Sequence, residues 1–181
     1  MVLPLPNPPS TETVDNQNAS ALGNTKNMRD NKGNDTNELI EVRHSKVHGL
    51  GAFAKRALPA GADLGVYEGH RYSLKQAMRK DWNPTMTYLF ELSDGTFIDG
   101  SRGGNGTRHF NHACDPNCEA FEDTLPDGNL TIRFRTTTAV AAGEELFLDY
   151  QLGVVEEADL AQYLCRCGAR ACRGTLVALP A

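Results

Sequence analysis

The sequence has no cysteine among its first hundred residues and only five in the whole chain of 181. A disulfide framework spread over the fold is therefore excluded, and the close spacing of the last three indicates thiolate ligands in a reducing compartment. No apolar run approaches the ~20 residues that cross a membrane. The first residues also lack the basic and apolar regions of a secretory signal. We therefore expect a soluble, intracellular protein with no membrane partner.

Positive charge is also scarce. The 18 lysines and arginines are outnumbered by 23 aspartates and glutamates, which gives a formal net charge of -5. Because a basic stripe interleaved with aromatic residues is missing too, direct binding of nucleic acid is not expected. A mildly acidic surface instead attracts a basic peptide. We expect a monomer whose partner is a protein segment of basic character.

Periodic apolar residues are missing from the first 36 positions, which are rich in Asn, Pro, Thr, Ser and Asp. Such a segment cannot bury enough apolar surface to offset the entropy of ordering, so residues 1–36 are predicted to form a disordered tail. After the tail the pattern changes to short β-like runs separated by turns. The predicted division continues with a folded domain over 37–152 and a cysteine-rich segment over 153–181.

Strands alternating with long helices are absent as well, which excludes a doubly wound α/β sheet. The fold is predicted to be mainly β with short helices. One helix is expected over Ser73–Trp82, where Ser73 and Gln76 have the spacing of a capping box, and a second over Val154–Tyr163. The expected strands are Leu39–Arg43, Asp63–Glu68, Met86–Leu92, Thr96–Asp99, Leu130–Arg135 and Glu145–Tyr150.

The last cysteines form a Cys165-x-Cys167-x4-Cys172 pattern, with three thiols in eight residues. A structural zinc site takes four tetrahedral ligands, of which this segment supplies three. The fourth is Cys114 or Cys118, with a histidine as the other alternative. The competing interpretation is a set of unligated thiols near the chain end.

Two further segments are rich in polar residues or in glycine. The stretch 108–118 contains one arginine, two histidines, two asparagines and two cysteines, which favours a metal or ligand site over a hydrogen-bonded loop. His48-Gly49-Leu50-Gly51 is a Gly-x-Gly turn, which allows close backbone approach to a ligand. A tight turn between strands explains it equally well, since the strand–GxGxxG–helix context of a dinucleotide site is missing. Taken singly, Tyr88 and Tyr150 are more typical of packing residues than of catalysts.

In this order, these pieces resemble the SET-domain family of protein-lysine methyltransferases. The resemblance covers residues from about 39 to 176. It is carried by the His-Gly-x-Gly turn, Tyr67 and Gly69, Tyr88-Leu89-Phe90, Ile98-Asp99, Arg108-x-x-Asn111-His112-x-Cys114-x-Pro116-Asn117, Gly143-Glu144-Glu145-Leu146-x-x-Asp149-Tyr150 and the terminal cysteines. It implies small curled sheets, a C-terminal pseudoknot of a β-clip kind, a SET domain over 37–152 and a post-SET zinc segment over 153–181.

The resemblance also implies S-adenosylmethionine and Zn²⁺ as cofactors and assigns roles to residues. Tyr150 is the expected catalytic hydroxyl, and it lines the substrate channel with Tyr88 and Leu148. The expected zinc ligands are Cys114, Cys165, Cys167 and Cys172, with Cys118 as a spare thiol. The expected cofactor-binding residues are His48, Gly49, Leu50, Gly51, Tyr88, Arg108, Asn111, His112 and Arg166. The implied substrate is a lysine in a protein, possibly a histone or a histone-like basic protein.

The chemistry explains why such a site needs tyrosines. The attacking lysine must be uncharged, although its reference pKa is about 10.4. A narrow apolar channel beside a positive sulfonium disfavours the ammonium form. Tyrosine hydroxyls can then hold the amine in line with the methyl carbon, and positioning of this kind supplies up to roughly 7–11 kcal/mol. A tyrosine with an ordinary pKa near 10 is not expected to act as a base.

The chain departs from the family pattern at Leu148, a position usually held by Phe or Tyr. This position governs how many methyl groups the pocket accepts. Leucine has no hydroxyl to anchor a water beside the amine, so di- or trimethylation is expected.

The alternatives to an enzyme are a catalytically silent SET fold that binds peptides and a zinc-dependent nucleic-acid module. The first is disfavoured by the presence of Tyr88, Asn111, His112 and Tyr150.

Overall fold

The computed structural model of the chain describes residues 37–80, 82, 88–153 and 163–178. The tail predicted over 1–36 and most of the helix predicted over Val154–Tyr163 lie outside these residues. No helix in the described residues is long and apolar enough to span a membrane.

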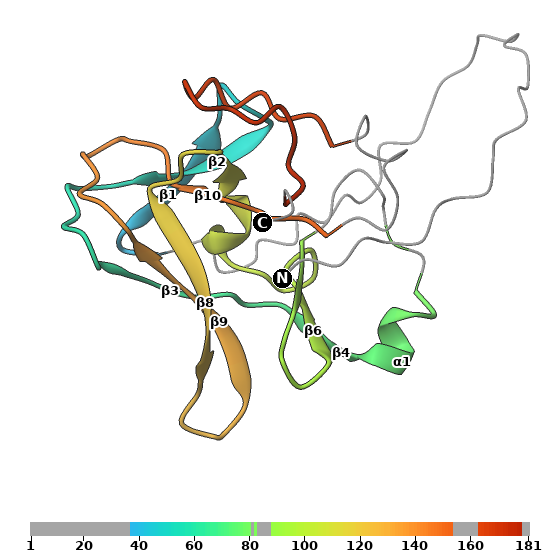
Figure 1. Cartoon of the computed structure of the whole chain (residues 1–181). Coiled ribbons are helices and arrows are strands. Elements are labelled where there is room, and N and C mark those ends of the chain that lie inside the picture. The colour runs from blue at the N-terminus through green and yellow to red at the C-terminus, as the bar shows by residue number, and fades with distance from the viewer. Residues whose placement is uncertain (1–36, 81, 83–87, 154–162, 179–181) are drawn as a thin grey trace, which may run out of the picture.

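Four small sheets make up the described fold, which confirms the mainly-β prediction (Figure 1). The first pairs β1 (Ile40–His44) with β2 (Leu50–Ala54) in antiparallel fashion. The second contains, in spatial order, β3 (Asp63–Val66), β9 (Leu130–Thr136) and β8 (Cys118–Thr124). The third contains β4 (His70–Ser73), β6 (Thr96–Asp99) and β5 (Leu89–Glu91).

The fourth sheet is the one that bears on the site. Here β7 (Asn111–His112) and β10 (Phe147–Leu148) run parallel, with Asn111 opposite Phe147 and His112 opposite Leu148. A parallel pair needs a long connection, and β8 and β9 lie within it. The pairing places the predicted Asn-His motif directly beside the segment that leads to Tyr150. Threading of the C-terminal segment as a pseudoknot stays a prediction.

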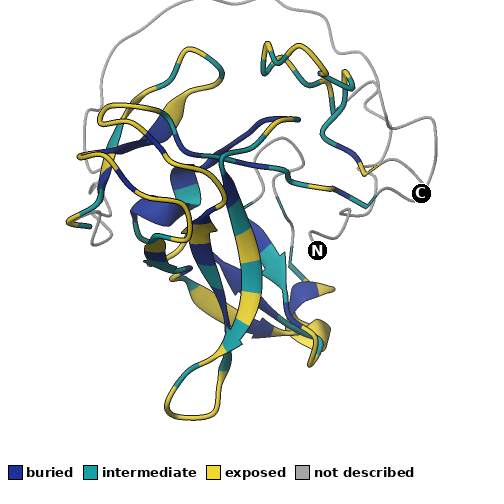
Figure 2. Ribbon diagram, turned by 60° about the vertical axis from the view of Figure 1, so that its left-hand side comes forward, coloured by how far each residue is buried: buried dark blue, intermediate teal, exposed yellow. Residues whose placement is uncertain are grey.

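The core forms where the sheets meet, as the buried residues in Figure 2 show. Its centre is Phe134 on β9, which is fully buried. Tyr67, Phe90 and Phe110 each present their rings edge-on to Phe134, with ring centroids 4.9–6.0 Å apart. This packing mode is favoured by the aromatic quadrupole. The aromatic core therefore packs against the segments around Tyr67 and Phe110, which carry or adjoin predicted site residues.

The predicted helix over Ser73–Trp82 is wrong in length. The α1 helix (Leu74–Ala77) begins at the expected capping box, since the Ser73 hydroxyl accepts from Gln76 N and Gln76 Oε1 accepts from Ser73 N. It ends early because the Trp82 indole donates to the Ala77 carbonyl over 2.9 Å, which satisfies a carbonyl that the next turn would otherwise use. A side chain five residues further along the chain therefore caps the helix end.

The strand predictions are confirmed in part. The β6 strand has the predicted bounds, and β1, β3, β5 and β9 overlap their predicted runs. The run predicted over Glu145–Tyr150 contains only the two residues of β10. Five elements were missed: β2, β4, β7, β8 and the 3-10 helix η1 (Gly106–His109). The β2 strand escapes a pattern search because its Gly and Ala residues carry little strand signal, although four of its five residues are buried.

Candidate active site

Four cysteines from two distant segments meet in one cluster. The sulfur atoms of Cys114, Cys165, Cys167 and Cys172 all lie within 4.8 Å of one another. Cys114 Sγ is 3.7 Å from Cys165 Sγ and 3.9 Å from Cys172 Sγ. A tetrahedral zinc ion with ~2.3 Å bonds to sulfur needs its ligands ~3.8 Å apart, so the arrangement fits the ion. Of the alternatives left open by spacing, the structure selects Cys114 as the fourth member.

Backbone amides surround the cluster. The N–H of Cys114 points to Cys167 Sγ, that of Cys167 to Cys165 Sγ, and that of Gly174 to Cys172 Sγ, over 3.4–3.5 Å. Hydrogen bonds of this kind stabilise thiolates and orient metal ligands. Burial nevertheless raises the pKa of Cys165 to about 12, whereas the hydrogen bonds to Cys167 outweigh burial and lower its pKa to about 7. The charged thiolate is therefore favoured at Cys167.

Cys118 lies outside the cluster. It begins β8, is only 1% exposed and contacts Asn117 Oδ1 through its sulfur. Burial raises the pKa of Cys118 to about 12, so it stays a neutral thiol in the core. This placement agrees with its prediction as the spare cysteine.

His112 joins the cysteine cluster to Tyr150. Its Nδ1 accepts the backbone N–H of Tyr150 over 3.1 Å, and its Nε2 is 3.4 Å from Cys114 Sγ. Burial lowers the pKa of His112 more than the nearby Asp149 raises it, so the ring is neutral at pH 7. Because Nδ1 accepts, the ring hydrogen belongs on Nε2, where it faces the sulfur. Both ring nitrogens of His112 are thus in contact with groups of the protein itself.

The side chain of Asn111 holds the Gly-x-Gly turn in place. Its amide nitrogen lies 3.2 Å from the His48 carbonyl, 3.1 Å from the Leu50 carbonyl and 2.8 Å from Glu145 Oε1. Gly51 has no room for a side chain, because an added Cβ would lie 2.2 Å from that same carboxylate oxygen. The predicted close approach at this turn is therefore to Glu145, within the protein.

The outer surface of the turn stays open. His48 is exposed, and Leu50 is 44% exposed. Gly49 adopts a positive φ of 48°, and nothing lies within 4 Å of the place where its Cβ would be. An uncovered apolar side chain beside backbone carbonyls suits a ligand that has both an apolar and a polar part.

Replacing Asn111 with alanine tests how far this side chain supports the turn. We expect a loss of about 2–3 kcal/mol in the free energy of unfolding, because two carbonyls and one carboxylate lose a buried donor. Thermal unfolding measures it. The matched control is Asn129→Ala in the exposed β8–β9 turn, which should stay within about 0.5 kcal/mol. Equal effects in the two variants would contradict the assigned role.

Three tyrosines form a second cluster. The Tyr150 hydroxyl donates to the Phe110 carbonyl over 2.8 Å, and the Tyr67 hydroxyl donates to the Tyr88 carbonyl over 2.7 Å. Burial raises the pKa of both Tyr67 and Tyr150, and each is raised further by electrostatic interaction with Tyr88. The hydroxyls of Tyr67 and Tyr150 therefore stay protonated at neutral pH, and the channel formed by Tyr88 and Tyr150 stays a prediction.

Tyr67 was not predicted as a site residue, although it belongs to the Tyr-Glu-Gly segment that carries part of the resemblance. It supports Tyr88 together with Gly100, whose N–H donates to the same Tyr88 carbonyl over 2.9 Å. Gly100 packs so closely that an added Cβ would lie 2.3 Å from the Tyr67 hydroxyl. These contacts join residues far apart in sequence, so local patterns carry no sign of them.

The remaining predicted residues are spread around these clusters. Arg108 lies on η1, where its Nε donates to His109 Nε2 over 3.0 Å. Arg166 is an exposed residue of the cysteine loop. Leu148 is 5% exposed and packs in the main core, and its carbonyl accepts from Ala113 N over 2.9 Å. The roles predicted for these three residues stay predictions.

Comparison with known proteins gives the same family as the motifs. The SET domain model matches residues 49–151. Histone-lysine N-methyltransferase 2B of Homo sapiens is 32% identical over 141 residues, which cover 75% of this chain and 5% of that protein. Histone-lysine N-methyltransferase SETD2 of Homo sapiens is 34% identical over 142 residues (76% and 5%). Histone-lysine N-methyltransferase, H3 lysine-4 specific, of Mycosarcoma maydis is 33% identical over 139 residues (74% and 9%).

This chain thus spans less than a tenth of the length of each of these three relatives. The match to the family model, however, covers more than half of the chain and contains the tyrosine cluster, Asn111, His112 and Cys114. The protein belongs to the SET-domain family.

Proposed function

We propose that this chain is a protein-lysine N-methyltransferase that uses S-adenosylmethionine and acts on a lysine in a basic protein segment. The observation that carries the proposal is the way Tyr150 is held at both ends. Its hydroxyl bonds to the carbonyl of Phe110, and its backbone N–H bonds to His112. The residue between them, Asn111, fixes the open turn at Leu50. One short segment therefore positions both a tyrosine hydroxyl and the exposed turn.

The tyrosine cluster supplies what amine methylation requires of a protein. Because the Tyr150 hydroxyl hydrogen is taken by the Phe110 carbonyl, its oxygen lone pairs remain to accept an N–H from a substrate amine. The raised pKa of Tyr150 means that it orients the amine and does not remove its proton. Tyr88, supported by Tyr67, is the proposed second wall of the channel. Fixed oxygens beside a partly positive methyl carbon add electrostatic stabilisation.

The residues proposed to hold S-adenosylmethionine are the four of the open turn, His48, Gly49, Leu50 and Gly51, together with Tyr88, Arg108, Asn111, His112 and Arg166. Their fit rests on the uncovered Leu50 side chain and on the free space at Gly49. When bound, this cofactor supplies a methyl group on a positively charged sulfur, which an uncharged amine can displace. The side chains of Asn111 and His112 are occupied within the protein, so we assign their contacts with it to backbone groups.

The proposed metal is Zn²⁺, held by the four clustered cysteines. When bound, it cross-links the C-terminal segment to Cys114, two residues after His112. The C-terminal segment thus becomes a part of the framework around Tyr150. The proposed substrate is a histone, because the three relatives described above are histone-lysine methyltransferases by name and because an acidic chain attracts basic segments.

Incubation of the purified chain with methyl-labelled S-adenosylmethionine and core histones tests the proposal. We expect label on histone, and none when the histones are replaced by an acidic protein of similar lysine content. Calorimetric titration with the cofactor shows whether the chain binds it. Cofactor binding without label on any basic protein would contradict the enzyme and favour a peptide-binding SET fold.

Leu148 gives a second test, directed at the number of methyl groups. We expect the wild-type chain to add two or three methyl groups to one lysine, and Leu148→Tyr to stop at one because its hydroxyl anchors a water beside the amine. Mass spectrometry over a time course measures this. Leu148→Met, which conserves volume, is the control and should keep the wild-type product. A wild-type reaction that stops at one methyl group, with Leu148→Tyr unchanged, would show that residue 148 has no such role.

A further inference from the structure

An ion pair joins the C-terminal segment to the residue beside Tyr150. The Arg173 guanidinium donates from Nη1 to Asp149 Oδ2 over 2.7 Å and from Nη2 to Oδ1. The two side chains are only 17% and 19% exposed, so solvent screens the pair less than it screens a surface ion pair. The bidentate contact between a planar guanidinium and a carboxylate also fixes the orientation of both side chains.

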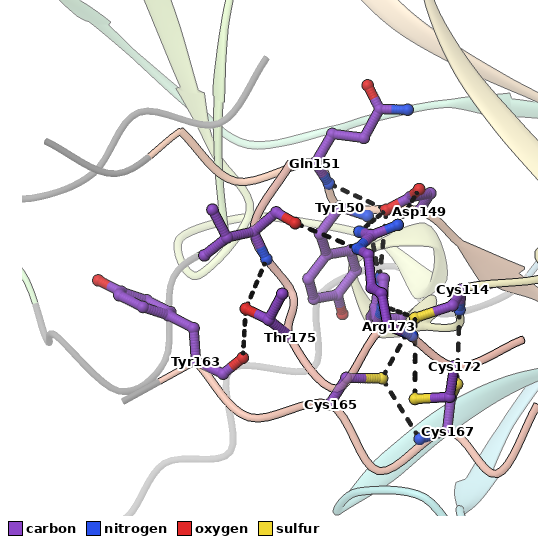
Figure 3. A network of polar contacts seen from close by, with 12 residues as sticks. Cys114, Asp149, Tyr150, Gln151, Tyr163, Cys165, Cys167, Cys172, Arg173 and Thr175 are labelled. Carbon is purple, nitrogen blue, oxygen red and sulfur yellow. Dashed lines mark hydrogen bonds and ion pairs between the residues drawn. The ribbon is translucent and has the colours of Figure 1, made fainter. Parts of the chain in front are cut away.

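Arg173 touches the cysteine cluster through its backbone. It directly follows Cys172, and its N–H points to Cys114 Sγ over 3.5 Å. Its Nε donates to the Val177 carbonyl over 3.1 Å, which braces the segment that follows. Figure 3 shows Arg173 lying between the four sulfur atoms and Asp149. One residue therefore contacts both the cluster and the tyrosine segment.

Asp149 shapes the turn on which Tyr150 lies. Its Oδ1 accepts the N–H of Gln151 over 3.2 Å, in addition to its bond from Arg173. Gln151 has a φ of 44°, the only positive φ among the described residues that are not glycine. Side chains rarely adopt this conformation unless the surroundings hold it. The carboxylate and its guanidinium partner provide that support directly after Tyr150.

His112 provides a second connection between the cysteine cluster and Tyr150. His112 contacts the backbone of Tyr150 on one side and Cys114 Sγ on the other. Cys114 Sγ thus receives the Arg173 N–H and the His112 ring from two directions. Because Asp149 and Tyr150 are adjacent, two separate sets of contacts join the cysteine segment to Tyr150.

We propose that Asp149 and Arg173 are positioning residues. Their ion pair couples closure of the cysteine lobe, the described C-terminal residues 163–178, to the placement of Tyr150. The inference rests on the methyltransferase function proposed above for its catalytic part. Neither side chain is placed against the reacting atoms; both act through the backbone of Tyr150 and the segment around Cys172. Without the pair, the lobe opens more often and the Tyr150 turn loses its support.

The first test measures Zn²⁺ release from the full-length, zinc-loaded chain into a chromophoric chelator. Asp149→Asn and Arg173→Gln should each release zinc about 10-fold faster than wild type, because removing one partner leaves the other charge unpaired. The double variant should be no faster than the faster single variant, since the interaction is already lost. Arg173→Lys should recover part of the effect, because it keeps the charge but not the two-pronged contact.

Arg170→Gln is the matched control. It removes the same charge from an exposed arginine of the same loop and should leave the release rate unchanged. If Arg173→Gln does not fold, as judged by circular dichroism, the comparison of Arg173→Lys with Asp149→Asn takes its place. Release rates that multiply in the double variant, or an equal acceleration by Arg170→Gln, would overturn the coupling.

The second test measures kcat and KM for methyl transfer by the same zinc-loaded variants. We expect kcat to fall more than KM rises, because the pair orients Tyr150 and does not bind substrate. Faster zinc release with unchanged kcat would overturn the link to Tyr150. If wild-type protein transfers no methyl group at all, the proposed function fails, while the zinc-release measurements still decide whether the pair closes the lobe.

Discussion

Tyr150→Phe is expected to lower the rate of methyl transfer about 100-fold or more while the chain stays folded. The change removes one oxygen, the atom that we assign to orient the amine, and losses of this size follow removal of a single positioned polar group in other active sites. The unfolding free energy should fall by only about 1 kcal/mol, the worth of the hydrogen bond to the Phe110 carbonyl. Initial rates with labelled cofactor and thermal unfolding measure the two effects.

Tyr163→Phe is the matched control for this change. Tyr163 is also partly buried, but it contacts the C-terminal segment through its backbone carbonyl, which accepts from Leu176 N and from the Thr175 hydroxyl. Removing its hydroxyl should leave the rate within about twofold of wild type. A Tyr150→Phe rate as high as that of the control would remove Tyr150 from the mechanism.

Cys172→Ser is expected to abolish stoichiometric zinc binding and to lower methyl transfer about 100-fold. A serine hydroxyl replaces one of four thiolates, and the binding free energy of a structural zinc ion is folding free energy for the segment that holds it. The loss reaches the tyrosine cluster because Cys114 contacts His112 and Arg173. Elemental analysis gives the zinc content, and labelled cofactor gives the rate.

Cys118→Ala is the control for Cys172→Ser. It removes a buried thiol that takes no part in the cluster, at a cost of about 1 kcal/mol in stability from the small cavity. Zinc content and rate should both stay at the wild-type level. Full zinc binding by Cys172→Ser, or loss of zinc from Cys118→Ala, would show that the four ligands are wrongly assigned.

The features predicted best from the sequence are those set by neighbouring residues. The β6 strand and the Ser73–Gln76 capping box depend on local pattern and local hydrogen bonds, and both appear as expected. Spacing alone identified three members of the cysteine cluster but left Cys114 and Cys118 equivalent. The motif order favoured Cys114, and the structure places Cys114 in the cluster and Cys118 in the core.

Contacts between distant segments were beyond the reach of sequence patterns. The support of Tyr88 depends on Tyr67, 21 positions away. The pair of Asp149 and Arg173 joins segments whose relative placement follows from the cysteine cluster. Asn111 and His112 were predicted to bind a ligand, yet their side chains mainly organise the protein. Polar residues in a motif can serve function by holding other groups in place.

The most direct test of the account is mass spectrometry of core histones after incubation with the zinc-loaded chain and S-adenosylmethionine, with Tyr150→Phe beside it. We predict that wild type adds methyl groups to the side-chain nitrogen of lysine and that the variant, folded and zinc-bound, adds almost none. Histones that stay unmodified under conditions where cofactor binding is measured, or equal methylation by both proteins, would contradict the proposed function.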